Sequence, residues 1–195
     1  PSLMTKKLAK LIPREENDAY LKIMYWFFSY PAREVGLTEL AQHLKIAKTT
    51  ANKIVTQLAK EKFLKIEIIG NLWRISSDQA HQYNILWKIP YNLQLVYRSG
   101  IIAEIHKVIH NPRSIILFGS YRKGDDHEKS DIDIAVEVLD EQELQIINLG
   151  NIPQLGYRTN VLVNLHVFFR NKIDLNLFSN IANEIVLEGF LEVHA

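Results

Sequence analysis

The sequence predicts an α+β protein built from two dissimilar parts, and three observations carry that prediction. The first part shows helical periodicity that ends in a short hairpin pattern. The second part mixes strand-like apolar segments with helical ones, which is typical of a mixed α/β sheet domain. The charge divides in the same way: residues 1–79 carry 13 Lys and Arg against 8 Asp and Glu, whereas residues 80–195 carry 10 against 14. Two modules with different partners are therefore indicated.

The composition excludes several classes of protein. Hydrophobic residues make up 47% of the 195 positions and charged residues 23%, which is ordinary for a soluble globular protein. The chain contains no cysteine, so disulfides and thiolate metal sites are excluded, and we expect a cytoplasmic protein. No apolar run approaches the roughly 18 residues that a membrane span requires, so no membrane partner is expected.

Two helices are expected near the start of the chain. The first covers residues 17–30, has a broad apolar side and begins at a capping residue, Asn17 or Asp18. Thr38 is a second capping signal and precedes a short helix over residues 39–44.

A third helix and a hairpin follow. The helix covers residues 49–61, and the strands cover residues 64–69 and 72–75 with a two-residue turn at Gly70-Asn71. Helix, short helix, turn, helix and hairpin is the order of a winged helix-turn-helix. Apolar residues of the third helix repeat at helical spacing and would face the core: Ala51, Ile54, Val55, Leu58 and Ala59.

The segment LTELAQHLKIAKTTANKIVTQLAKEKFLKIE resembles the DNA-binding region of MarR-like regulators, with a likeness over residues 17–76. The resemblance implies a winged helix-turn-helix domain over residues 1–78 that places its third helix in the major groove of double-stranded DNA. Thr, Asn and Gln can read base edges, whereas Lys mostly meets phosphate. A protein-interaction module is the alternative, and the basic imbalance favours DNA. The residues expected to face DNA are Lys48, Thr49, Thr50, Asn52, Lys53 and Gln57 on the helix and Arg74 on the wing.

Residues 79–111 read as a helical connector that is rich in aromatic residues and is broken or kinked at Pro90. Its later part has the spacing of an amphipathic helix that packs on the following domain. Its aromatic part serves either core packing, which we favour, or a homodimer contact. His106 and His110 are four residues apart and could share a helical face, but two histidines without a third ligand usually lie on the surface.

The most informative motif joins two short patterns. Gly119-Ser120 follows a compact apolar strand over residues 114–118, and after ten further residues comes Asp131-Ile132-Asp133. Glycine lets backbone N–H groups approach a phosphate. The two aspartates alternate with apolar residues, so they project side by side from one face of a strand, where they can hold a hard cation such as Mg²⁺.

This motif resembles the nucleotidyltransferase superfamily, which includes DNA polymerase beta and the small MNT-type enzymes. The resemblance implies a nucleotidyltransferase-like domain over residues 112–195 and Mg²⁺-assisted transfer of a nucleoside monophosphate from a nucleoside triphosphate to a hydroxyl acceptor. Asp131 and Asp133 would be the catalytic metal ligands. The residues expected to hold the triphosphate are Gly119, Ser120, Arg122 and Lys123.

The remaining segments complete the predicted mixed sheet. We expect a helix over residues 140–148 capped by Asp140, a strand over 160–169, a helix over 174–188 and a short strand over 190–193. A loop between the first helix and the long strand is marked by Gly150, Pro153 and Gly156.

One carboxylate of the family pattern is missing. Family enzymes usually carry a third acid on the strand beside the Asp-x-Asp strand, where it completes a two-metal site. The matching strand, residues 160–169, contains neither Asp nor Glu, and Asn164 or His166 would occupy the position. His166 could act as the base, because its unperturbed pKa is about 6.5. Alternatively, catalysis has been lost and the domain senses nucleotide or holds a partner.

The sequence therefore leads to one main hypothesis and two alternatives. The main one is a DNA-binding regulatory protein whose second domain binds NTP with Mg²⁺ and transfers NMP. The first alternative is a transcription regulator whose second domain is a non-catalytic sensor or dimerisation body. The second is an MNT-type antitoxin that acts on a HEPN-type protein partner, although such short proteins commonly lack a winged helix.

Overall fold

The computed structural model describes residues 18–192, and the chain divides into two compact units. The first unit ends at residue 77 and does not include residues 28–32, which belong with residue 78 onward to the second unit. Asn17, one of the two predicted caps of the first helix, lies outside the described residues, and so does the side chain of Asp18.

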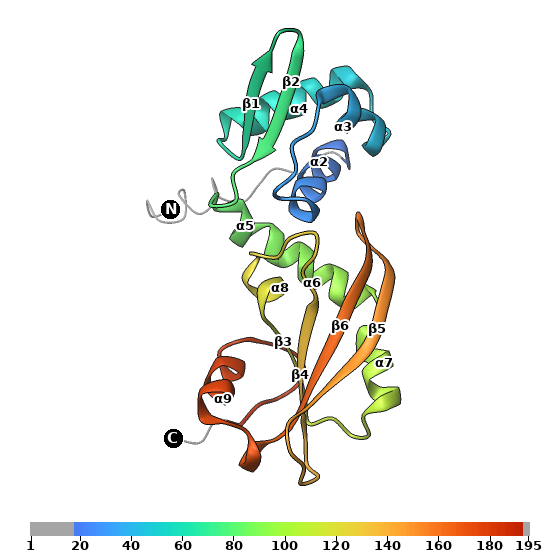
Figure 1. Ribbon diagram of the computed structural model, residues 1–195, viewed down its shortest axis with the longest axis vertical. Coiled ribbons are helices and arrows are strands. Elements are labelled where there is room, and N and C mark those ends of the chain that lie inside the picture. The colour runs from blue at the N-terminus through green and yellow to red at the C-terminus, as the bar shows by residue number, and fades with distance from the viewer. Residues whose placement is uncertain (1–17, 193–195) are drawn as a thin grey trace, which may run out of the picture. The chain divides into compact units, whose positions relative to one another are not determined.

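From residue 18 onward, where the structure describes the chain, the first unit contains three helices followed by a hairpin (Figure 1). Its elements are α2 (Asp18–Ser29), α3 (Leu37–Leu44), α4 (Lys48–Lys60), β1 (Leu64–Ile69) and β2 (Leu72–Ser77). The strands are antiparallel and join through Gly70 and Asn71, as predicted. Val35 adds a single bridge to Ile75 at the side of β2.

Apolar spacing explains the helices of this unit. The predicted inner face of α4 is buried, with Ala51, Ile54, Val55 and Leu58 between 0% and 4% exposed, whereas Ala59 is only half-buried. The predicted cap at Thr38 is wrong, because α3 begins at Leu37, two residues before the predicted start at residue 39, and its N-cap is Gly36. Leu37 is buried, so packing of its side chain extends the helix past the local capping signal.

The predicted helical connector consists of three short helices, α5 (Tyr83–Leu86), α6 (Lys88–Arg98) and α7 (Ile101–Val108). Pro90 does not break the connector, contrary to the sequence-based expectation. It lies in the first turn of α6, where a backbone N–H has no partner within the helix and its absence costs little. The chain is instead interrupted at Trp87, which separates α5 from α6.

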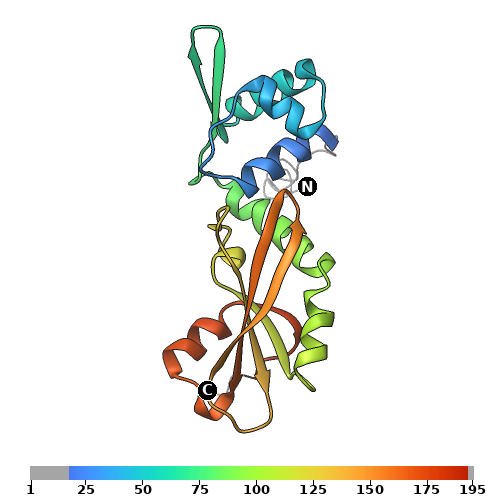
Figure 2. The same ribbon diagram turned by 45° about the vertical axis from the view of Figure 1, so that its right-hand side comes forward.

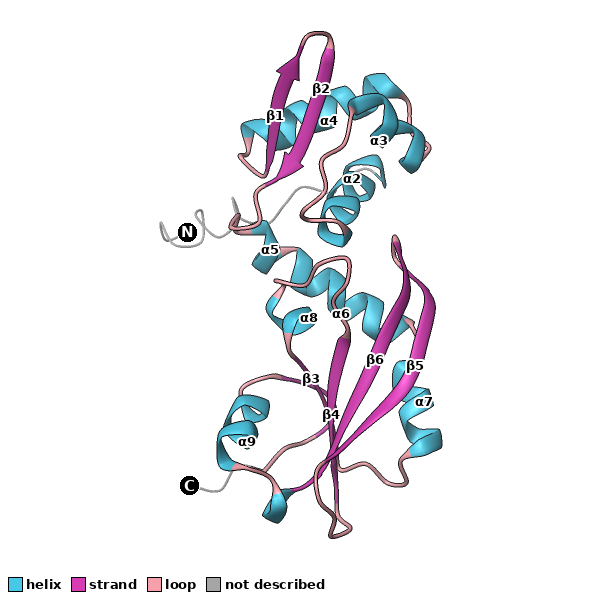
Figure 3. Cartoon of the chain, viewed as in Figure 1, coloured by secondary structure: helices cyan, strands magenta, loops and turns pink. Residues whose placement is uncertain are grey.

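The second unit is built on a mixed sheet, as predicted (Figure 3), and among the described residues this sheet has five strands. Its strand order is β5-β6-β4-β3-β7, with β4 and β6 parallel and every other neighbouring pair antiparallel. The strands are β3 (Ser114–Phe118), β4 (Ile132–Val138), β5 (Gln145–Leu155), β6 (Arg158–Phe169) and β7 (Ile185–Gly189).

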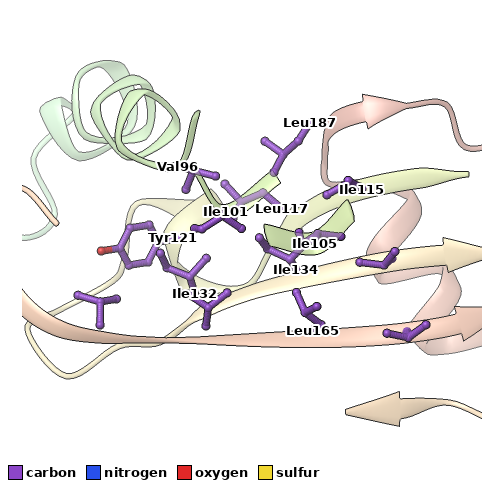
Figure 4. Close-up of a cluster of buried hydrophobic side chains, with 14 of the residues drawn as sticks. Val96, Ile101, Ile105, Ile115, Leu117, Tyr121, Ile132, Ile134, Leu165 and Leu187 are labelled. Atoms are coloured by element: carbon purple, nitrogen blue, oxygen red, sulfur yellow. The ribbon is translucent and has the colours of Figure 1, made fainter. Parts of the chain in front are cut away.

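Apolar side chains cover the two faces of this sheet unequally. On one face, β4 presents Ile132, Ile134 and Val136 to α6 and α7, and together they form the larger core (Figure 4). On the other face, Ile116, Ala135 and Phe168 form a smaller core with residues of α9 (Leu175–Ala182). Because successive strand residues face opposite sides, Asp133 lies on the face of the smaller core.

The predicted helix over residues 140–148 is wrong, and so is most of the loop after it. Residues 145–155 form the edge strand β5, which lies beside β6 along its length (Figure 2). Gly150 sits at a shift in register and Pro153 at an edge position, where both residues are tolerated in strands. Pairing with the long strand β6 therefore outweighs the weak local helical tendency.

The last predicted helix is too long, and the last strand is misplaced. Helix α9 ends at Ala182, and the next apolar residues form β7, which pairs with β3. Asp174 caps α9 by accepting hydrogen bonds from the backbone N–H groups of Asn176 and Leu177. Residues 190–192 are not a strand, and Val193 lies outside the described residues. The edge of β3 explains the position of β7, because the backbone N–H and C=O groups at that edge require hydrogen-bond partners.

Candidate functional site

The two predicted metal-ligand aspartates lie where the chain enters β4. Asp131 precedes the strand and Asp133 lies in it, and both side chains are half-buried. Ile132, between them, is fully buried in the larger core on the opposite face. The alternation of a strand thus anchors the apolar residue and leaves both carboxylates at one surface.

Gly119 lies close to Asp133. It follows β3 and has a φ angle of 76°, in the left-handed region that favours glycine. A Cβ atom built at this position would lie 3.0 Å from Oδ2 of Asp133. Ser120 follows at once as the first residue of the short helix α8 (Ser120–Lys123). The positive φ angle requires a residue such as glycine, and the nearby Asp133 side chain leaves little room for a Cβ atom.

Strand β6 supplies Asn164 and His166 to the same surface. In the parallel register Asn164 stands beside Asp133, and its Nδ2 atom donates to Oδ2 of Asp131 at 3.3 Å. His166 has its Nε2 atom 3.5 Å from Oδ1 of Asp133, and its ring meets the edge of Phe118 with centroids 4.9 Å apart. We call these residues the carboxylate site: Gly119, Ser120, Asp131, Asp133, Asn164 and His166.

The two cations predicted to hold triphosphate are placed differently from each other. Arg122 is directed toward the segment between α9 and β7, where its Nε atom lies 2.6 Å from Oε2 of Glu184 and its Nη2 atom donates to the carbonyl of Asn183. Lys123 is exposed to solvent. The structure therefore gives Arg122 an ion pair of its own rather than an open position.

A buried polar network, which the sequence did not reveal, supports the loop before Asp131. Asp126 is 2% exposed and Lys88 1% exposed, with 3.2 Å between Nζ of Lys88 and Oδ1 of Asp126. Lys88 also donates to the backbone carbonyl of Asp126. Asn92 donates from Nδ2 to Oδ1 of Asp126 at 2.7 Å and to the carbonyl of Tyr121 at 2.9 Å.

Arg158 at the start of β6 extends this network toward the site. Its Nη1 atom donates to the hydroxyl oxygen of Tyr121 at 2.6 Å, and its Nη2 atom donates to the carbonyl of Ser130. Ser130 directly precedes Asp131, so the buried network fixes the backbone from which Asp131 projects. We call the set the buried network: Lys88, Asn92, Tyr121, Asp126 and Arg158.

Burial perturbs the ionisation of this network. Desolvation lowers the pKa of the Lys88 ammonium and raises the pKa of the Asp126 carboxyl, while the attraction between the two groups opposes both shifts. Desolvation also raises the pKa of the Tyr121 hydroxyl. Sequence could not reveal these contacts, because Lys88 and Asp126 are 38 positions apart.

Most of the residues predicted to face DNA are accessible on α4. Lys48, Thr49, Asn52, Lys53 and Gln57 are exposed, and Thr50 is half-buried. The N-cap residue Ala47 offers no side-chain hydrogen bond, and the first turn contains no acidic residue. The helix thus begins with unsatisfied N–H groups and a lysine, which together attract anions.

Arg74, the predicted wing contact, is already paired. Its Nε atom lies 3.3 Å from Oε2 of Glu34, and its Nη1 atom lies 3.8 Å from Oε2 of Glu67. The tip of the hairpin is apolar, with Ile68, Ile69 and Leu72 between 54% and 74% exposed. The hairpin therefore presents less positive charge than the sequence suggested.

The two histidines of the connector do not share one helix. His106 is near the end of α7, with its Nε2 atom 2.6 Å from Oε1 of Glu188, whereas His110 lies beyond the helix. Within residues 18–192 no group of three His, Asp or Glu side chains is arranged to hold a metal ion.

Comparison with known proteins agrees with the motif of the second unit. A family model described as "Polymerase beta, Nucleotidyltransferase" matches residues 101–191, which run from α7 through β7 and include the carboxylate site. The match supports a nucleotidyltransferase-superfamily domain in this part of the chain. No curated protein matches the chain. In the described residues, no helix is both long enough and apolar enough to span a membrane.

Proposed function

We propose that this chain is a DNA-binding regulatory protein whose second unit binds a nucleoside triphosphate together with Mg²⁺. The observation that carries the nucleotide part is the close approach of Gly119 to Asp133, two residues after Asp131, in the segment that matches the family model. The first unit supplies the DNA part, as a winged helix-turn-helix, through the arrangement of its elements and the face of α4.

The donor set of the carboxylate site fits Mg²⁺. This ion is usually held by one or two carboxylates together with phosphate oxygens of the substrate. Asp131 and Asp133 are half-buried, and their neighbours Asn164 and His166 carry no fixed positive charge that would displace a cation. Bound there, Mg²⁺ would offset the negative charge of the triphosphate. Gly119 and Ser120 would offer backbone and hydroxyl donors to the phosphates.

Calorimetry with ATP and Mg²⁺ tests this binding. We expect saturable binding that requires both components and falls at least tenfold in Asp133→Asn, because that variant loses one of the two anionic ligands. Asp125→Asn is the matched control, since Asp125 is an exposed acid of the same loop and should change affinity little. Binding that is equal in both variants, or no binding of any NTP, would refute the nucleotide proposal.

The DNA proposal rests on the exposed polar face of α4 and on its anion-attracting N-terminus. Lysines near phosphates release counterions, so affinity for duplex DNA should fall steeply as salt rises. Lys53→Gln should weaken binding to all sequences and reduce the salt slope by about one unit. Lys129→Gln, an exposed lysine of the second unit, is the control. An unchanged slope in Lys53→Gln, measured by fluorescence anisotropy, would argue for a protein-interaction role instead.

Transfer of NMP is a second candidate function, favoured by the position of His166. An acceptor hydroxyl oxygen would form a bond to the α-phosphorus, the bond to the β-phosphate oxygen would break, and pyrophosphate would leave. The hydroxyl proton needs an acceptor, and His166, 3.5 Å from Asp133, is the candidate. Pyrophosphate release that His166→Asn abolishes without changing ATP affinity would support this role. Release at an unchanged rate would exclude it.

A further inference from the structure

We infer that the carboxylate site holds a single divalent cation with the triphosphate, and that Asn164 is the residue that prevents a second cation from binding. The inference rests on the proposed nucleotide binding and concerns the number of cations in the same site. It makes the second unit primarily a binder of cation and nucleotide.

The register of the sheet places Asn164 at the decisive position. Strands β4 and β6 are parallel neighbours, and Asn164 is the residue of β6 that stands beside Asp133. A second hard cation would need an anionic oxygen from this strand to share the charge. An amide at that position offers one neutral oxygen instead of a carboxylate.

The orientation of the amide reduces even that contribution. The Nδ2 atom of Asn164 points to Oδ2 of Asp131 at 3.3 Å, so the N–H end of the side chain faces the acidic pair. An N–H donor next to a carboxylate offsets part of its negative charge. Asn164 therefore provides, as a fixed dipole, some of the compensation that a second cation would otherwise supply.

No other described group replaces the missing ligand. His166 is the only remaining titratable neighbour that the described structure places in contact with the pair, and imidazole nitrogen is a poor ligand for Mg²⁺. Its ring is also held between Asp133 and the edge of Phe118. Among residues 18–192 no further His, Asp or Glu completes a set of three. Two carboxylates and the phosphates then suffice for one cation.

Counting bound Mn²⁺ tests the inference. Mn²⁺ replaces Mg²⁺ as a paramagnetic probe, and α,β-methylene-ATP serves as a nucleotide that cannot be cleaved at the transfer position. Electron paramagnetic resonance of free Mn²⁺ gives the number of ions bound per chain. We expect one ion in the unmodified protein and two in Asn164→Asp, which introduces the missing carboxylate. The double variant Asp131→Asn with Asp133→Asn supplies the background from nucleotide alone.

Asn164→Ala is the matched control, because it removes the amide without adding a charge and should still bind one ion. Two ions in the unmodified protein would overturn the inference and leave the proposed nucleotide binding intact. A single ion in a folded Asn164→Asp would overturn the role of Asn164. Absence of both Mn²⁺ and nucleotide would defeat the proposed function and this inference with it. If Asn164→Asp does not fold, the count in the unmodified protein still decides the number of cations.

Discussion

Asp126 and Asp133 are carboxylates on either side of one short turn, and the structure treats them in opposite ways. Asp126 is 2% exposed and is surrounded by Lys88, Asn92 and Arg158. The side chain of Asp133 is 31% exposed and faces a histidine. A buried charge is tolerated only when it is paired and hydrogen-bonded. A half-exposed acid beside a second acid instead remains available to a ligand.

The difference lies in the loop between α8 and β4, where Asp126 is buried, and in the aspartates after it, which are half-buried. The buried network fixes residues 126 and 130, and the alternation of β4 fixes residue 132. Asp131 and Asp133 are therefore presented from a backbone that is held on both sides. Gly124 contributes to this anchoring, because a Cβ atom there would lie 2.2 Å from the carbonyl oxygen of Asn84. The hydrogen-bonded part of the loop thus positions the two aspartates that we propose as ligands of the cation.

Replacing each acid with asparagine should reveal the largest difference between them, in the free energy of unfolding. We expect Asp126→Asn to lower the free energy of unfolding by about 3–5 kcal/mol, because Lys88 and Arg158 lose a buried counter-charge. Asp133→Asn should change it by less than about 0.5 kcal/mol, as at most half-exposed positions. Urea denaturation measures both values, and equal losses in the two variants would refute the distinction.

Removing both buried charges together tests whether unpaired charge causes the loss of stability in Asp126→Asn. The combination of Lys88→Met with Asp126→Asn should recover part of the loss, because no ammonium then remains buried without a partner. Lys107→Met, at an exposed lysine, controls for the change of residue type. A double variant as unstable as the sum of both single ones would point to lost packing rather than to unpaired charge.

The dependence of stability on high pH tests the burial of Tyr121. Burial raises the pKa of Tyr121 above its value in the unfolded chain, about 10. The unfolded state therefore loses its proton first, so this residue's contribution to stability is full below pH 10 and falls as the pH rises above it. At pH 11 the loss should be about 1.4 kcal/mol, the energy of one pH unit.

Comparison of the unmodified protein with Tyr121→Phe isolates this term. The variant loses the hydrogen bond from Arg158 at every pH, which costs about 1 kcal/mol, but it lacks the ionisable group. Urea denaturation at pH 8 and pH 11 should therefore show a smaller alkaline loss in Tyr121→Phe. The same loss in both proteins would mean that Tyr121 ionises normally in the fold.

The smallest effect concerns Arg122, whose partner Glu184 competes with the proposed phosphates. Glu184→Gln should cost at most about 1 kcal/mol of stability, since the pair is partly exposed. It should raise the affinity for ATP with Mg²⁺ a few-fold, on the order of 1 kcal/mol or less, if the freed guanidinium reaches the triphosphate. Glu188→Gln, which removes the partner of His106, is the control. An unchanged affinity, measured by calorimetry, would remove Arg122 from the nucleotide site.

The sequence alone was sufficient for features that depend on local pattern. Strand β3, which ends just before Gly119, follows from a compact apolar run, and β4, which carries Asp133, follows from apolar alternation. Helices α4 and α7 follow from apolar residues at helical spacing. Weak sequence patterns gave wrong predictions where a strand edge was available for pairing. Residues 145–155 pair with β6, and residues 185–189 pair with β3. In both places backbone pairing with a distant strand decided the conformation.

The same division holds for the candidate site. Sequence predicted the candidate residues for cation and nucleotide, because the Gly-Ser and Asp-x-Asp spacing is local, and it showed that the neighbouring strand carries no acid. Only the tertiary structure decided that Asn164 turns its N–H toward Asp131 and that Glu184 engages Arg122. It also brought Lys88 to Asp126, since contacts between residues far apart in the chain depend on how the sheet and helices pack.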